Sequence, residues 1–163
     1  LLAELKTIEG ITVRSGLAGT GIVVDIQGAY PGRCVALRAD MDALPITEDT
    51  GVEYRSTRPG FMHACGHDGH MAALVGAVRV LARRRAELHG RVRDGALEGV
   101  DAIFGFHNWP ESPWGRIETT TGTLMAAADD LHIVLHGRGA HASQPHRSVD
   151  CVVAAAQLVL ALQ

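Results

Sequence analysis

Residues 63 to 70 read His63-Ala64-Cys65-Gly66-His67-Asp68-Gly69-His70, and the sequence then turns apolar from Met71 to Leu81. The apolar residues have the spacing of a helix that packs on a core. This pattern predicts an extended loop that enters a core helix from about Gly69 to Leu88, with Asp68 as its N-cap. On extended backbone the side chains of Cys65 and His67 leave from the same face, so both can reach one metal ion.

The cluster has simpler interpretations that we weighed against metal binding. A lone cysteine such as Cys65 is more often a small buried hydrophobe than a ligand. The residues around Cys65 favour a metal site, because a histidine follows two residues later and a further candidate histidine lies elsewhere in the sequence. We predict Cys65 and His67 as ligands. His63 and His70 are not expected to be ligands, because His70 points into the first turn of the helix and His63 faces away.

Residues 21–26 and 34–37 have the pattern of two strands joined by a turn. Two short apolar runs predict buried strands of an α/β sheet, and polar residues follow both. The first run, residues 35–37, precedes Asp40 and Asp42, and the second, residues 100–106, precedes His107 and Asn108. Open α/β sheets carry their chemistry beyond the carboxyl ends of the strands, so we predict His107 as a third ligand. For residues 40–45 the alternative is a turn held by aspartate and proline.

The composition narrows the class of protein. The chain has 163 residues, 47% of them hydrophobic, and a net charge of −3, which provides no basic footprint for nucleic acid or an anionic membrane surface. Three cysteines at wide spacing form no disulfide framework, which favours a reducing cytoplasm. No apolar run reaches membrane-spanning length and no signal peptide is visible, although the chain begins with Leu1 rather than methionine.

The character of the sequence changes after Gly122. We interpret residues 1–126 as a metal-binding α/β domain and residues 127–163 as the start of a smaller domain. In that second part, residues 131–137 alternate like a half-exposed strand, and residues 150–163 form an apolar, alanine-rich helix.

Four motifs resemble one known family in content and in order. They are Leu37-Arg38-Ala39-Asp40-Met41-Asp42-Ala43-Leu44-Pro45, Met62 to His70, Gly105-Phe106-His107-Asn108-Trp109-Pro110 and Gly139-Ala140-His141-Ala142-Ser143-Gln144-Pro145-His146. The chain resembles the M20 metallopeptidases, in particular the branch of aminoacylases, hippurate hydrolases and indole-acetyl-amino-acid hydrolases. The resemblance implies an incomplete catalytic α/β domain, followed by part of a smaller inserted α+β lid domain that often forms a dimer.

The resemblance also assigns roles to individual residues. Cys65, His67 and His107 match metal ligands of a centre that holds two divalent ions (Zn, Mn, Co or Ni), and Asp42 matches the catalytic aspartate that supports the metal site. His141 matches a lid histidine that reaches the substrate carbonyl. Asn108 and His141 are the expected substrate-binding residues.

One departure from the family is large. The family carries a Glu-Glu pair, of which the first is the general base and the second a metal ligand, and a segment that should hold it is missing near residues 93/94. Glu87 and Glu98 do not lie in the matching context. We therefore expect the complete protein to hydrolyse the amide bond of small N-acyl amino acids such as hippurate-like or N-acetyl compounds. The resemblance also implies a homodimer that forms through the lid. The present chain alone is expected to be inactive.

Two other functions stay open at the level of sequence. The chain could be an inactive truncated fold that only binds metal or dimerises. Alternatively, Cys65 could be the nucleophile of a thiol hydrolase, with a histidine as its base.

Overall fold

The structure, a computed structural model, describes residues 1–94 and 96–163. The chain forms two compact units, Leu1–Arg116 and Ile117–Gln163. Each is described by itself, and the predicted domain boundary between residues 126 and 127 stays a prediction.

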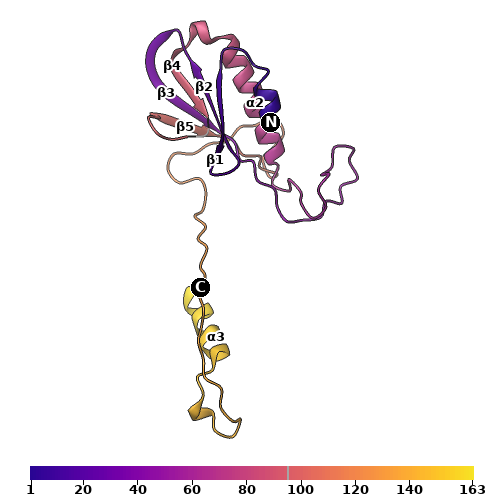
Figure 1. The fold of residues 1–163 in the computed structure, drawn as a ribbon, viewed down its shortest axis with the longest axis vertical. Coiled ribbons are helices and arrows are strands. Elements are labelled where there is room, and N and C mark those ends of the chain that lie inside the picture. Colours follow the sequence, from indigo (N-terminus) through magenta and orange to yellow (C-terminus); the bar gives the residue numbers. More distant parts are fainter. Residues whose placement is uncertain (95) are drawn as a thin grey trace. The chain divides into compact units, whose positions relative to one another are not determined.

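A five-stranded mixed sheet forms the centre of the first unit (Figure 1). Its strands are β1 (Thr12–Leu17), β2 (Gly21–Gln27), β3 (Tyr30–Arg38), β4 (His89–Asp94) and β5 (Ala102–Gly105), in the order β1-β2-β4-β3-β5. Strand β3 runs parallel to both of its neighbours, β4 and β5, while β1, β2 and β4 pair antiparallel. The predicted strands within residues 21–26, 34–37 and 100–106 are confirmed, and the α/β class with them.

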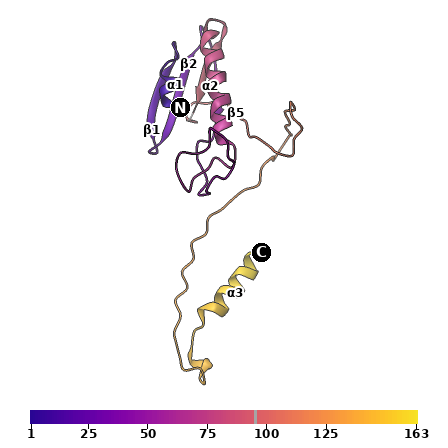
Figure 2. The same ribbon diagram turned by 90° about the vertical axis from the view of Figure 1, so that its right-hand side faces the viewer.

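One face of this sheet is covered by helices. Helix α2 (His67–Arg83) lies along the face, with the short α1 (Leu2–Leu5) beside it, and the 3-10 turn η1 (Arg85–Glu87) follows α2 (Figure 2). The core between the layers is built from Leu5, Val24, Ile26 and Val78. Because the apolar residues of α2 recur at helical spacing, burying them orients the helix and fixes the position of its N-terminus.

Two sequence predictions about these elements are wrong. Asp68 is not the N-cap of the core helix: α2 begins at His67 with Gly66 as its N-cap, because Gly66 takes a left-handed conformation (φ 75°) that turns the chain into the helix. The second error concerns β5, which we expected to be buried. All four of its residues are exposed, because β5 is the edge strand of the described sheet.

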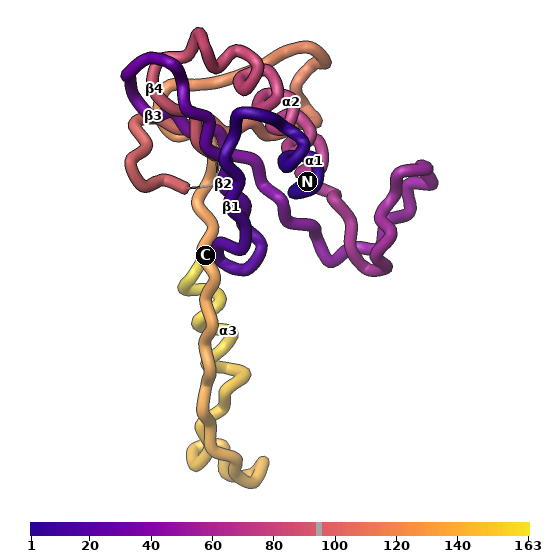
Figure 3. The backbone as a smooth tube through the Cα atoms, turned by 45° about the horizontal axis from the view of Figure 1, so that its top comes forward, coloured from indigo at the N-terminus to yellow at the C-terminus, as the bar shows by residue number. Residues whose placement is uncertain are grey.

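A long loop, residues 39–66, connects β3 to α2 and extends away from the sheet (Figure 3). An isolated antiparallel bridge between Leu44 and Met62 joins its two arms. This bridge returns the chain to the end of β3, so the residues after β3 and the Cys/His stretch before α2 lie close together.

The second unit contains the 3-10 turn η2 (Pro145–Arg147) and helix α3 (Cys151–Leu162). The Asp150 carboxylate caps α3 by accepting the backbone N–H groups of Val152 and Val153, which confirms the predicted helix. The predicted strand over residues 131–137 is wrong: the described second unit offers only an isolated bridge, Arg138 to Val149, and a strand needs a neighbour for its backbone groups. None of the helices in the described parts of the chain has the length and apolar character needed to cross a membrane.

Gly90 allows β3 and β4 to approach closely, and replacing it tests that packing. Its φ is +80°, and a Cβ there would collide with the backbone oxygen of Arg33. We expect Gly90→Ala to lower the free energy of unfolding by about 3 kcal/mol, as the sum of left-handed strain and overpacking. Gly51→Ala is the matched control, because Gly51 is also left-handed (φ +69°) but has open space around it, and it should cost about 1 kcal/mol. Equal losses in urea denaturation would contradict this packing.

Candidate metal centre

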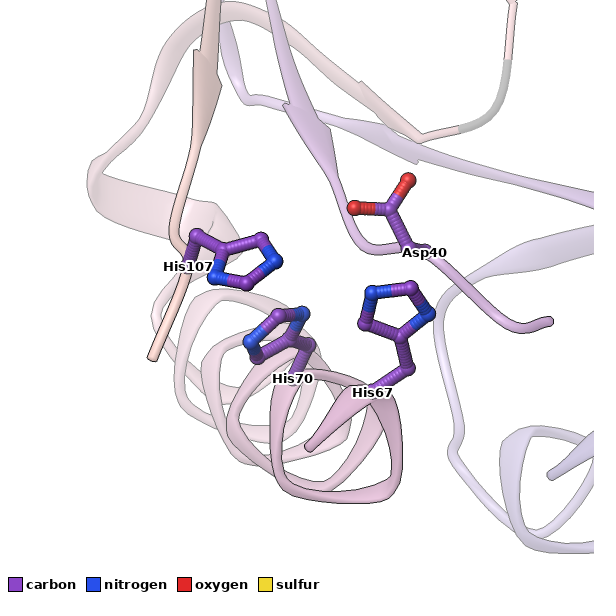
Figure 4. A group of neighbouring side chains, drawn as sticks. All are labelled: Asp40, His67, His70 and His107. Carbon is purple, nitrogen blue, oxygen red and sulfur yellow. The ribbon is translucent and has the colours of Figure 1, made fainter. Parts of the chain in front are cut away.

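The candidate site lies at the carboxyl ends of β3 and β5, beside the N-terminus of α2. The parallel register pairs Arg38 of β3 with Gly105 of β5. Asp40 and His107 each lie two residues after this pair. The first turn of α2 adds His67 and His70 (Figure 4). One potential ligand atom from each of Asp40, His67, His70 and His107 lies within 4.8 Å of those of the others. This is the edge at which α/β sheets bind ligands.

Two of the three predicted metal ligands, His67 and His107, belong to this cluster, and the third, Cys65, lies beside His107. The Sγ atom of Cys65 lies 3.4 Å from Nε2 of His107, and the rings of His67 and His107 are 5.6 Å apart and mutually perpendicular. Cys65 and His67 come from the loop before α2 and from its first residue, whereas His107 follows β5. The fold therefore gathers donors from two distant parts of the chain.

Asp42 fixes the orientation of His67. The Nδ1 atom of His67 lies 3.0 Å from both the backbone oxygen and the Oδ1 atom of Asp42. A carbonyl oxygen can only accept a hydrogen bond, so the neutral ring carries its proton on Nδ1 and leaves Nε2 with a free lone pair. A carboxylate bound to the far nitrogen is the usual support of a metal-binding histidine. The predicted supporting position of Asp42 therefore has a physical basis, and its catalytic role stays a prediction.

His107 is held in the same tautomer by the main chain. Its Nδ1 atom lies 2.6 Å from the backbone oxygen of Asn108, which can only accept. The ring therefore donates from Nδ1, and Nε2 is left bare beside the sulfur of Cys65. His67 and His107 thus both present a nitrogen in the form that binds metal.

His70 differs from the other two histidines. The backbone N–H of Asn108 donates to its Nε2 atom over 2.8 Å, so the neutral ring must carry its own proton on Nδ1. The side chain is only 2% exposed, and Nδ1 has no hydrogen-bond partner among the described residues. Burial, followed by the neighbouring His107 and His67, lowers the pKa of His70 and keeps it neutral. His70 therefore lies in the cluster as a hydrogen-bond donor rather than as a ligand.

The sequence prediction that His70 points into the first turn of the helix did not include its buried position in the cluster. The available signal was its spacing, because His67 and His70 are three residues apart and share one face of a helix that starts at His67. The expectation for His63 is closer to the structure: its Nδ1 atom reaches the backbone oxygen of Asp42, at 3.1 Å, and it is not part of the four-residue cluster. Asp40, which the sequence placed at a strand end, forms an ion pair with Arg38.

Asn108 holds the site together with its backbone and its side chain. Besides its two backbone contacts, its Nδ2 atom donates to the backbone oxygen of Gly66 over 3.1 Å. Gly66 is tightly placed, since a Cβ there would meet Asn108 Nδ2 at 2.6 Å. These contacts organise the histidines, while the predicted role of Asn108 in substrate binding stays a prediction.

His141 belongs to the second unit, where its Nδ1 atom lies 2.9 Å from the Ser143 hydroxyl oxygen. This contact holds the side chain locally. The predicted action of His141 on a substrate carbonyl stays a prediction.

The donors at the centre suit a divalent ion of the later first transition series. A cysteine sulfur and imidazole nitrogens are ligands of zinc, cobalt and nickel, and zinc in proteins takes such N and S donors. The unprotonated nitrogens of His67 and His107 share the cluster with the Asp40 carboxylate, and the sulfur of Cys65 lies beside the nitrogen of His107. The residues present therefore fit a metal ion.

Several known proteins are similar to this chain in sequence and fold. Residues 36–94 match the profile of Peptidase family M20/M25/M40. The N-acetyl-L-cysteine deacetylase of Bacillus subtilis (strain 168) is 43% identical over 173 residues, which cover 95% of this chain and 42% of that protein. The N-acyl-L-amino acid amidohydrolase of Geobacillus stearothermophilus is 38% identical over 163 residues, covering 88% of this chain and 44% of that protein.

A solved structure of the same family is similar to this chain in fold. The YXEP protein of Bacillus subtilis, described as a dinuclear metal binding peptidase from the M20 family, superposes with a TM-score of 0.62 at 40% identity. The superposition covers 69% of this chain and 36% of that one. The chain therefore spans less than half of the length of each of these relatives.

Removal of the Asp42 carboxylate tests the support of His67. We expect Asp42→Ala to weaken zinc binding about 10-fold, the lower end of the usual effect of such partners, because the backbone oxygen of residue 42 still accepts from Nδ1. Competition with a chromogenic chelator measures the affinity. Asp68→Ala is the control, because it removes the same charge near the site without contacting a histidine. A loss as large in the control would show that charge alone is responsible.

Proposed function

Because the chain belongs to the M20 family of peptidases, we propose that the complete protein hydrolyses the amide bond of N-acyl amino acids with the help of divalent metal ions. The products are a carboxylic acid and a free amino acid. The names of the relatives, a deacetylase of N-acetyl-L-cysteine and an amidohydrolase of N-acyl-L-amino acids, support this class of substrate.

The observation that carries the proposal is the meeting of Cys65, His67 and His107. Both imidazoles offer an unprotonated Nε2, because the Asp42 and Asn108 backbone oxygens accept hydrogen bonds from their Nδ1–H groups. The sulfur of Cys65 lies next to one of these nitrogens. Three donors with fixed orientation are what a protein needs to hold a metal ion while leaving positions for water and substrate.

A bound divalent ion would supply acidity to a water molecule and polarise the amide carbonyl. This chain's own residues hold the ligands in place: Asp42 keeps His67 from rotating, and the Asn108 backbone does the same for His107. His141 would donate a hydrogen bond to the carbonyl oxygen of the substrate, as single donors of this kind do in other hydrolases. Hydrolysis also needs a base that takes the proton of the attacking water.

We propose that this base is absent from the present chain. The four-residue cluster contains one carboxylate, Asp40, and that carboxylate is paired with Arg38. The match to the Bacillus subtilis deacetylase extends over 173 residues although this chain has 163, so the comparison includes positions that this chain skips. The resemblance to the family predicts the interruption near residues 93/94, in the last residues of β4, where the family carries its Glu-Glu pair. The chain would then bind metal without turning over substrate.

Activity measurements test this account directly. The chain loaded with zinc, manganese or cobalt should show no hydrolysis of N-acetyl amino acids or of hippurate above the metal-only control. Insertion of a Glu-Glu segment between Arg93 and Asp94 should strengthen zinc binding, because the second glutamate of the pair would be a metal ligand, and the same insertion with both glutamates changed to glutamine should not. Turnover by the unmodified chain would show that the glutamates are not needed.

The contact between Cys65 Sγ and His107 Nε2 favours one alternative, a thiol hydrolase with Cys65 as nucleophile and His107 as its base. Chelation separates the two functions in any active form of the protein. Removal of metal by a chelator should abolish activity, and added zinc should restore it. Activity that survives chelation and disappears on alkylation of Cys65 would establish the thiol mechanism.

We further propose that the second unit belongs to a lid that contributes to a homodimer. A reducing cytoplasm, which keeps the Cys65 thiol available to metal, is the compartment that suits this chemistry.

A further inference from the structure

His70 carries a buried hydrogen-bond donor that the chain does not use. Its Nδ1 atom is fully enclosed and has no partner among the described residues. A buried donor without an acceptor costs about 1–3 kcal/mol, so such atoms are rare in native proteins. An unused donor at the edge of a ligand site points to an acceptor that arrives with a ligand.

The direction of this donor follows from the hydrogen bond on the other side of the ring. The Asn108 amide occupies Nε2 at 2.8 Å, which leaves Nδ1 as the free nitrogen. In Figure 4 the ring of His70 lies between those of His107 and His67, and one of its nitrogens faces the space that these rings share with Asp40. The N–H group therefore faces the same space as the donors of the metal centre.

The two carboxylates at the site already have partners. Asp40 pairs with Arg38, and Asp42 accepts from His67. His67 and His107 donate hydrogen bonds from Nδ1 to Asp42 and to the Asn108 backbone. His70 is therefore the one histidine of the three whose Nδ1–H group lacks an acceptor in the described chain. A metal ion beside this N–H group would attract an anion. An anion with oxygen atoms could bind the metal ion and also accept a hydrogen bond from His70 Nδ1.

We propose that the His70 Nδ1–H group and a metal ion held by Cys65, His67 and His107 together bind a small carboxylate. The carboxylate accepts a hydrogen bond from His70 and faces the cation with its negative charge. This inference rests on the proposed function, because it needs the metal ion, and it extends that function by assigning to His70 the recognition of a carboxylate such as the acid product.

Two substitutions by residues with amide side chains test the two ring nitrogens of His70 one at a time. In His70→Gln the longer side chain brings its oxygen near the position of Nε2, where it can still accept from Asn108, but no donor remains at Nδ1. In His70→Asn the shorter side chain brings its N–H near the position of Nδ1 and loses the contact with Asn108. His63→Gln makes the same chemical change at a half-buried histidine outside the cluster.

The experiment measures zinc content by elemental analysis and acetate binding to the zinc-loaded chain by calorimetry, with chloride at equal ionic strength as the reference anion. We expect the unmodified chain and His63→Gln to bind acetate with the same affinity and in preference to chloride. His70→Gln should retain its zinc and bind acetate about 10-fold more weakly, the usual effect of one hydrogen bond to a charged group. His70→Asn should be less stable to urea and still bind acetate.

Each remaining outcome has a definite meaning. Unchanged acetate affinity in zinc-loaded His70→Gln would overturn the role of His70 and leave the proposed function intact. Equal binding of acetate and chloride would overturn the preference for a carboxylate. Failure of the unmodified chain to bind zinc would overturn the proposed function and, with it, this inference.

Discussion

The backbone of one residue, Asn108, sets the chemistry of two histidines. Its N–H donates to His70 Nε2, and its carbonyl oxygen accepts from His107 Nδ1. Because a backbone amide can only donate and a carbonyl oxygen can only accept, the two rings face the site differently: His107 presents a lone pair and His70 presents a proton. Asn108 follows the edge strand β5, and the parallel pairing of β5 with β3 brings it to the end of α2. The remainder of the site depends on this placement.

The same geometry explains why proximity alone does not define the ligands. Asp40, His67, His70 and His107 all lie close enough together to hold an ion. Their other hydrogen bonds determine which of them can bind the ion. Asp42 accepts from Nδ1 of His67 and so leaves its Nε2 unprotonated, whereas the Asn108 amide donates to Nε2 of His70. Cys65 is outside that group of four and yet lies next to the bare nitrogen of His107. The contacts around a site therefore determine its chemistry as much as the residue types within it.

Much of the first unit could be predicted from sequence because its signals are local. The apolar runs around residues 21–26 and 34–37 predict strands, and polar residues after strands predict the ligand edge. The N-terminus of α2 was misplaced because Asp68 has the chemistry of an N-cap, whereas the left-handed Gly66 determines where the helix starts. Residues 131–137 alternate as a strand does, but no neighbouring strand pairs with them in the described part of the second unit. The spacing of His67 and His70 indicates a shared helix face, but the tautomer of His70 could not be deduced, since it depends on the Asn108 amide, 38 residues away.

The most direct test of this account is the state of each histidine ring before and after zinc is added, read from the nitrogen resonances in long-range ¹H–¹⁵N NMR. Before zinc, His67, His107 and His70 should all carry their proton on Nδ1. One equivalent of zinc should shift the Nε2 resonances of His67 and His107 to values of metal-bound nitrogen and leave His70 with its Nδ1 proton. Coordination of zinc by either nitrogen of His70 would contradict the account.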